Sequence, residues 1–145
     1  MTKVTATSLY FAYGSNLDPA QMEVRCPGAQ SSGIARAKGW AFRIYERGYA
    51  TITKSSDQEI WGGLWIVTDD HLDALDRYEG VSSGLYERTT LTVEVGGREL
   101  EAIVYIAELQ DDASPSRRYA ERVLAGAELF GLPCSYIAGI SEVMV

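Results

Sequence analysis

The stretch Tyr10-Phe11-Ala12-Tyr13-Gly14-Ser15-Asn16-Leu17 joins an apolar run to a group of small, turn-forming residues. Residues 9–13 have the apolar and aromatic composition of a buried strand. The next three residues favour a tight turn, because glycine accepts positive φ angles and Ser and Asn side chains bond their own backbone. The Asp-Pro pair that follows predicts a helix over residues 19–25, with Asp18 as its N-cap.

The loop Gly14-Ser15-Asn16 would present backbone N–H groups next to the positive end of that helix. This arrangement suits a carboxylate or a developing oxyanion. An ordinary strand-to-helix turn with a well-chosen cap explains the same residues, so both interpretations stay open.

The composition is that of a soluble globular protein: of 145 residues, 46% are hydrophobic and 23% are charged. We expect one domain spanning residues 1–145. The net charge of −7 argues against a nucleic-acid or membrane partner, since either would need a basic face. No apolar run approaches the ~18 residues of a membrane span, and the N-terminus lacks the pattern of a signal peptide. Cys26 and Cys134 stand outside any CxxC motif, which predicts reduced thiols and a cytoplasmic location.

Apolar patterning predicts short strands in the first half of the chain. We expect them over residues 33–37, 40–45, 48–53 and 60–67, with a turn at residues 55–57. Paired glycines inside the last of these strands indicate a bulge or a close approach of two backbones.

Helical spacing predicts a helix over residues 69–79, capped by the two aspartates at its start, and another over residues 114–130. Between them, residues 86–95 and 99–106 are expected to form a hairpin around Gly96-Gly97. Many strands and about three flanking helices indicate an α+β fold with a small, curled, mostly antiparallel and barrel-like sheet.

The sequence offers few groups for metal-dependent or nucleophilic catalysis. His71 is the single histidine, and GxSxG, CxxC, P-loop and dinucleotide-binding motifs are missing. We therefore expect no metal and no cofactor, and we interpret His71 as a surface residue in the first turn of its helix.

Glu79 is the carboxylate with the clearest physical reason to be reactive. It lies at the predicted C-terminus of a helix, where the macrodipole disfavours an anion, and apolar or aromatic neighbours such as Tyr78 would disfavour it further. Both effects raise the pKa of the carboxyl group, as a general base or acid near neutral pH requires. The alternative is a solvent-facing glutamate on an acidic surface.

Tyrosines are frequent in the predicted strands. Tyr10, Tyr13, Tyr86 and Tyr105 lie within strands or at their ends. A buried tyrosine needs a partner for its hydroxyl group, so these four side chains predict a polar cavity. Simple packing in the sheet is the alternative.

Together these features resemble the γ-glutamylcyclotransferase family. The family pattern is an aromatic strand ending in Tyr-Gly-Ser-Asn and, after a central helix, a Glu-Gly step. The two parts correspond to residues 10–17 and to Leu75-Asp76-Arg77-Tyr78-Glu79-Gly80. Further similar segments follow the family's order: Tyr49-Ala50-Thr51-Ile52, Glu59-Ile60-Trp61-Gly62, Ser83-Gly84-Leu85-Tyr86, Val104-Tyr105 and Gly131-Leu132-Pro133.

The resemblance implies a small barrel and a cofactor-free cyclisation, in which the α-amine of a γ-glutamyl compound attacks its own γ-carbonyl. The products would be 5-oxoproline and a free amine, usually an amino acid. The loop with Asn16 is most similar to the branch that acts on γ-glutamyl amino acids, since the glutathione-specific and γ-glutamylamine branches vary this loop. The implied partner is a small molecule, and a homodimer stays open.

The resemblance also implies roles for individual residues. Glu79 would be the catalytic proton shuttle, Tyr105 would form part of the cavity wall, and Tyr86 would be a second-line contact. The substrate-binding loop would comprise Tyr10, Phe11, Ala12, Tyr13, Gly14, Ser15 and Asn16. We therefore expect the loop backbone and Glu79 to face the same cavity.

Other functions stay open at this point. A cyclotransferase of this fold could instead act on γ-glutamylamines or another γ-glutamylated metabolite. A non-catalytic module could bind such metabolites without turnover, although the retained Glu79 counts against it. A structural protein is the third class, but the sequence shows no coiled coil, repeat or large tail.

Overall fold

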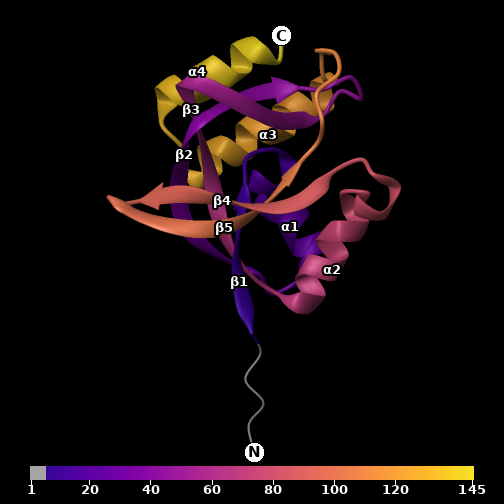
Figure 1. Cartoon of the computed structure of the whole chain (residues 1–145), viewed down its shortest axis with the longest axis vertical. Coiled ribbons are helices and arrows are strands. Elements are labelled where there is room, and N and C mark those ends of the chain that lie inside the picture. The colour runs from indigo at the N-terminus through magenta and orange to yellow at the C-terminus, as the bar shows by residue number, and fades with distance from the viewer. Residues whose placement is uncertain (1–5) are drawn as a thin grey trace, which may run out of the picture.

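The structure, a computed structural model that describes residues 6–145, is a closed β-barrel with helices packed around it (Figure 1). Within these residues the barrel has five strands in the order β1-β3-β2-β4-β5. The strands are β1 Thr7–Ala12, β2 Gln30–Ile44, β3 Ala50–Thr68, β4 Glu87–Val95 and β5 Arg98–Ile106. The helices are α1 Pro19–Arg25, α2 Asp69–Tyr78, α3 Arg117–Phe130 and α4 Cys134–Val143, with short 3-10 helices η1 Ser15–Leu17 and η2 Val81–Ser83. The predicted α+β, barrel-like fold is confirmed.

Strand β1 closes the barrel. It runs antiparallel to β3, with Tyr10 opposite Trp65, and parallel to β5, with Tyr10 opposite Ile103. Its side chains alternate between two apolar clusters: Phe11 joins the main core, while Tyr10 and Ala12 join a cluster that includes residues of α1 and α2. Burial on both faces explains why this strand reads as a continuous apolar run.

The four short strands predicted before the first long helix are two long strands, β2 and β3, which form one bent hairpin. The predicted turn at residues 55–57 is wrong. Lys38 pairs with Glu59 and Trp40 pairs with Lys54, so the polar residues between 54 and 59 form a bulge in the ladder. Polar residues that suit a turn also suit an exposed bulge, and pairing with β2 keeps the chain extended.

Gly62 and Gly63 mark close approaches, and the β2–β3 register also shifts between the pairs Ser31–Trp65 and Ile34–Gly63. A Cβ at Gly62 would collide with the carbonyl oxygen of Ala12 and would lie 2.7 Å from the ring of Phe11. A Cβ at Gly63 would collide with the ring of Phe130 at the end of α3. These glycines therefore let β1 and α3 pack directly on β3.

Helix α2 is capped by Thr68 rather than by the predicted aspartates, which lie in its first turn. The Thr68 hydroxyl accepts a hydrogen bond from the His71 N–H (3.2 Å), and His71 Nδ1 accepts one from the Thr68 N–H (3.1 Å). The Nε2 of the same ring lies 2.7 Å from the Pro27 carbonyl oxygen. His71 is thus a partly buried link between α2 and the end of α1, not the free surface residue we expected.

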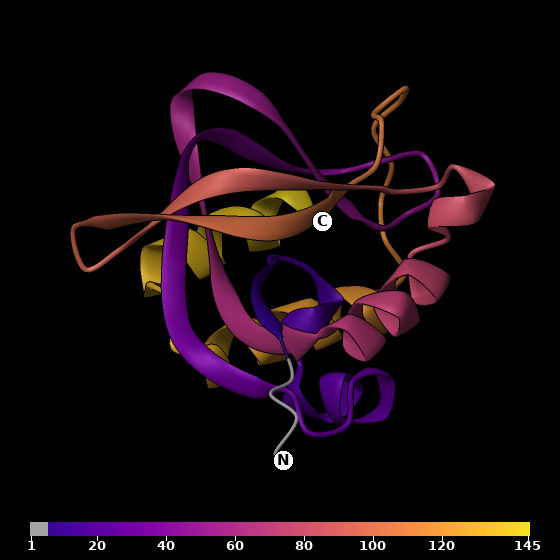
Figure 2. The same ribbon diagram turned by 60° about the horizontal axis from the view of Figure 1, so that its bottom comes forward.

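The C-terminal part contains a fourth helix, α4, where about three helices were expected in all. Helix α3 starts after Ser116, whose hydroxyl accepts from the Tyr119 N–H at 3.1 Å, so residues 114–116 precede it. Gly131, with φ of +89°, ends α3, and α4 follows. Figure 2 shows α2 to the right of the barrel. Helices α3 and α4 contact strands β3 and β2, respectively. No helix within residues 6–145 has both the length and the apolar character to cross a membrane.

The hairpin of β4 and β5 follows the prediction. Val95 pairs with Arg98, and both intervening glycines have positive φ angles, +55° at Gly96 and +83° at Gly97. Such angles are those of a two-residue hairpin turn, which a residue with a side chain would strain.

Candidate active site

A cavity of about 390 Å³ opens where β1 ends and α2 ends. The loop Gly14-Ser15-Asn16 and the side chain of Glu79 both line it. The prediction that these two segments face one cavity is therefore confirmed. The volume is within the ~300–1,000 Å³ that small-molecule sites occupy.

Backbone hydrogen bonds and packing of α3 hold the loop Gly14-Ser15-Asn16 in a defined shape. The N–H groups of Leu17 and Asp18 donate to the carbonyl oxygens of Gly14 (3.1 Å) and Ser15 (3.0 Å). Helix α3 packs directly on this turn, because a Cβ at Gly126 would lie 2.7 Å from the Asp18 nitrogen. Neither Gly14 nor Asn16 donates its own N–H to a backbone acceptor within residues 6–145.

Glu79 is the C-cap of α2, as its position at the helix end predicted. Its N–H donates to the Leu75 carbonyl (2.8 Å), and Gly80 follows in the left-handed conformation, with φ of +66°. The Glu79 side chain is 16% exposed, and Arg25 Nη1 lies 3.9 Å from its Oε1. Burial raises the Glu79 pKa from 4.5 to about 7, against the opposing charge of Arg25.

Tyr78, the expected aromatic neighbour of Glu79, lies against Arg25. The Tyr78 side chain is 53% exposed, and its ring lies 4.7 Å from the guanidinium carbon of Arg25. Tyr78 thus contacts the cation whose charge lowers the Glu79 pKa.

Asn16 joins the loop to Glu79. Its Nδ2 donates to the Tyr10 hydroxyl at 2.9 Å and lies 3.4 Å from Glu79 Oε1. Its Oδ1 accepts from Gln21 Nε2 (2.9 Å) and Arg25 Nη1 (3.1 Å). The side-chain amide of Asn16 is thus occupied by protein groups.

The four tyrosines predicted to form a polar cavity all line it. The hydroxyl of Tyr13 donates to the Tyr105 carbonyl (2.5 Å), that of Tyr105 to Asp76 (2.7 Å), and that of Tyr86 to the Ala50 carbonyl (2.6 Å). Burial raises the pKa of each of these hydroxyl groups above its usual value, so they stay neutral near pH 7.

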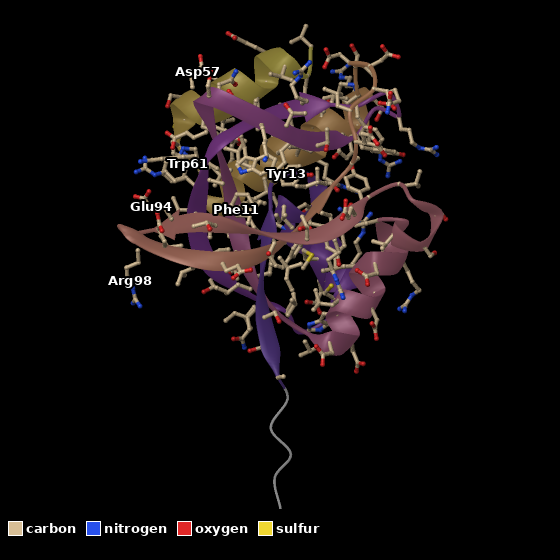
Figure 3. All side chains as sticks on the ribbon, viewed as in Figure 1. Phe11, Tyr13, Asp57, Trp61, Glu94 and Arg98 are labelled. Carbon is tan, nitrogen blue, oxygen red and sulfur yellow. The ribbon has the colours of Figure 1, made fainter. Side chains whose placement is uncertain are left out.

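Two residues of the predicted binding loop lie outside the cavity. Phe11 is fully buried in the main core, and Ala12 packs in the second apolar cluster. Figure 3 shows the labelled Phe11 and Tyr13 inside the molecule and Arg98 at its edge. Alternation along β1 accounts for the position of Phe11, because consecutive side chains of a strand point to opposite faces.

Comparisons with known proteins agree with this architecture. The model of the AIG2-like family matches residues 59–140. Gamma-glutamylcyclotransferase of Homo sapiens is 34% identical over 141 residues, which cover 88% of this chain and 74% of the human protein. The Bos taurus protein of the same name is 34% identical, with the same shares of both chains.

The chain belongs to the γ-glutamylcyclotransferase family. A solved structure described as a gamma-glutamyl cyclotransferase is 31% identical, covers 93% of this chain and 86% of its own, and superposes with a TM-score of 0.89. The likeness therefore extends over the barrel and the helices that position Glu79.

Other residues of this γ-glutamylcyclotransferase-family chain line the cavity but were not predicted as site residues. They are Gln21, Arg25, Tyr45, Arg47, Tyr49, Ala50, Tyr78, Leu85, Tyr119 and Arg122. They come from α1, the turn between β2 and β3, the start of β3, the end of α2, the loop before β4, and α3, so only the fold brings them together. Within residues 6–145, no group of three or more His, Cys, Asp and Glu side chains is placed to hold a metal ion.

Proposed function

We propose that this protein converts γ-glutamyl compounds to 5-oxoproline with release of the amine that the glutamyl group carried. The α-amine of the glutamyl group attacks its γ-carbonyl, forming a C–N bond, and the original amide C–N bond breaks. Glu79 accepts a proton from the amine and returns it to the leaving nitrogen. No atom is exchanged with a co-reactant, so the reaction needs no cofactor.

The observation that supports this function is the placement of Glu79 beside the loop. The carboxylate and the loop backbone line one cavity, and Asn16 spans the gap between them. Because nucleophile and electrophile belong to the same molecule, the site must hold the glutamyl chain folded and stabilise the oxyanion. The N–H groups of Gly14 and Asn16 are suitable donors for that purpose.

The chemistry of the cavity singles out Glu79 as the base. A free α-amine is mostly protonated near neutral pH, so a group must remove a proton before attack. Of the described residues that line the cavity, Glu79 alone carries a carboxylate, and its pKa of about 7 suits this task. The tyrosines serve instead as neutral walls around the glutamyl group.

The direct test is incubation of the purified protein with a γ-glutamyl dipeptide. We expect 5-oxoproline and the free amino acid to appear in equal amounts, without added metal. Binding of the dipeptide without formation of 5-oxoproline would favour a non-catalytic binding module. Turnover of γ-glutamylamines but not of γ-glutamyl dipeptides would favour a cyclotransferase specific for γ-glutamylamines.

We expect a side chain at Gly14 to harm substrate binding more than loss of the Ser15 hydroxyl. Gly14 has φ of −116°, so the cause is space and not a left-handed backbone. A Cβ there would lie 3.2 Å from the Tyr119 hydroxyl and 3.3 Å from the Ala50 Cβ, and valine would add further atoms. Gly14→Val should raise KM at least about tenfold, whereas Ser15→Ala loses a single hydrogen bond from Gln21 (2.7 Å). Equal, mild changes in KM would show that the loop is only a turn.

The pH dependence of turnover should follow Glu79 and respond to Arg25. Glu79 must be deprotonated to accept a proton, so kcat/KM should rise with pH through the pKa of about 7. Arg25 opposes the rise in that pKa, so Arg25→Gln should move the acid limb to higher pH and Arg25→Lys should move it less. Arg122→Gln is the control, since Arg122 pairs with Asp18 at 3.3 Å. If the acid side of the kcat/KM–pH profile is unchanged in Arg25→Gln, the group that titrates there is not Glu79.

We place the reaction in the cytoplasm and in one domain. Cys26 and Cys134 are both free thiols, which suits a reducing compartment. Burial raises the Cys26 pKa to about 11, so this thiol stays protonated and unreactive.

A further inference from the structure

Three arginines line the cavity, and they differ in what they contact. Arg25 donates to Asn16 Oδ1 at 3.1 Å, and Arg122 pairs with Asp18 at 3.3 Å. Arg47 forms neither a hydrogen bond nor an ion pair through its side chain with any residue between 6 and 145. One cation of the cavity is thus available to a ligand.

The turn that carries Arg47 is fixed. The Tyr45 N–H donates to the Tyr49 carbonyl (3.0 Å), and the Gly48 N–H donates to the Tyr45 carbonyl (2.8 Å). The Tyr49 ring packs edge-on against the Tyr119 ring, with the centroids 5.2 Å apart. A short turn held at both ends keeps the Arg47 backbone at a constant place on the cavity wall.

Glu46, the acidic residue next to Arg47 in the sequence, contacts other groups. Glu46 Oε1 accepts hydrogen bonds from the backbone N–H groups of Gln110 (3.1 Å) and Asp111 (3.4 Å). Hydrogen bonding to its own backbone N–H and to those of Gln110 and Asp111 lowers the Glu46 pKa, so the carboxylate already has partners. Glu46 and Arg47 therefore form no ion pair with each other.

A γ-glutamyl amino acid carries two carboxylates, one on the glutamyl half and one on the leaving amino acid. The glutamyl half must reach Glu79, whose side chain is 16% exposed, and the loop N–H groups beside it. Arg47 is exposed, so it lies towards the mouth of the cavity, where the leaving half must extend. An amine without a carboxylate would have no partner for this cation.

We propose that Arg47 binds the carboxylate of the leaving amino acid and thereby selects γ-glutamyl amino acids over γ-glutamyl amines. The role rests on the proposed cyclotransferase function and adds a specificity-determining residue to it. Arg47 touches the part of the substrate that does not react, so its effect is on which compound is bound.

The test compares γ-glutamyl-alanine with γ-glutamyl-alaninamide, which differ only in the leaving carboxylate. We expect the native enzyme to favour the acid by about fivefold in kcat/KM, the upper end for an exposed ion pair. Arg47→Gln should abolish this preference by slowing the acid alone, and Arg47→Lys should retain part of it. Arg98→Gln, at the edge of the β4–β5 hairpin (Figure 3), is the matched control and should leave the preference unchanged.

The outcomes separate the two proposals. Formation of 5-oxoproline with an equal effect of Arg47→Gln on both compounds, or with none on either, would overturn the role of Arg47 alone. Absence of 5-oxoproline from both compounds would overturn the proposed function and this role with it. Added salt should reduce the preference of the native enzyme for the acid, as expected for a screened ion pair. It should not change the ratio of kcat/KM values for the two compounds in Arg47→Gln.

Discussion

Replacing Glu79 with glutamine is expected to lower kcat by about 10²–10⁴-fold, the loss typical of a removed acid–base group. Glutamine keeps the size of the side chain and can still contact Asn16, but it cannot take a proton from the amine. KM should change little, because the loop and the tyrosines hold the glutamyl group. The measurement is the steady-state release of 5-oxoproline.

Glu79→Gln should also be more stable than the native protein above pH 7. The Glu79 pKa is about 7 in the folded state and near 4.5 when unfolded, so the folded state binds more protons between these values. Its stability therefore falls as pH rises through this window, and glutamine removes that penalty. Thermal unfolding at pH 5 and pH 8 measures the difference.

Glu101→Gln is the control for Glu79→Gln, since Glu101 is exposed on β5 and does not line the cavity. It should leave kcat unchanged. A folded Glu79→Gln variant with native kcat and a raised KM would mean that Glu79 only positions the substrate.

Gly62→Ala is expected to destabilise the protein by about 3 kcal/mol, at the upper end for overpacking. The added methyl group would meet the Ala12 carbonyl oxygen and the Phe11 ring, and the backbone oxygen cannot rotate away. The β1–β3 pairing must open to admit it, so the loop that follows β1 should shift as well. For a chain of this size the melting temperature should fall by about 10 °C.

Gly139→Ala provides the comparison, because it makes the same chemical change in an open position. Gly139 lies within α4 and has no positive φ, and a Cβ added there would have no neighbouring atom within 4 Å. Alanine at this position should leave stability unchanged or raise it by up to about 1 kcal/mol. Similar melting temperatures for both variants would contradict the close packing of β1 on β3.

Much of the fold was predictable because local signals were strong. The Asp-Pro start of α1, the Gly96-Gly97 turn and the Gly80 stop after α2 each follow from backbone chemistry, and all three are confirmed. The long β2–β3 hairpin was divided wrongly, since the polar residues 55–58 look the same in a bulge and in a turn. Thr68 was missed as a cap because a pairing with His71 replaces the usual acidic partner.

The candidate site was predictable only in part. Glu79 and the Gly14–Asn16 loop could be found because a helix end and a tight turn have recognisable sequences. Arg47 and Tyr119 could not, because nothing local distinguishes an arginine or a tyrosine at a cavity from one on the surface. Phe11 and Ala12, which were predicted with the loop, do not line the cavity, since a motif names consecutive residues while a strand presents alternate ones.

The pairing of β1 with β5 also bears on the stage of folding at which the cavity forms. Asn16 and Glu79 are 63 residues apart in the chain, and Tyr13 and the Tyr105 carbonyl are 92 residues apart. Contacts across such distances require large loops to close first, which slows folding and delays these contacts until most of the chain is in place. The cavity is therefore a property of the completed barrel, and recovered activity should appear in the same kinetic phase as barrel closure during refolding.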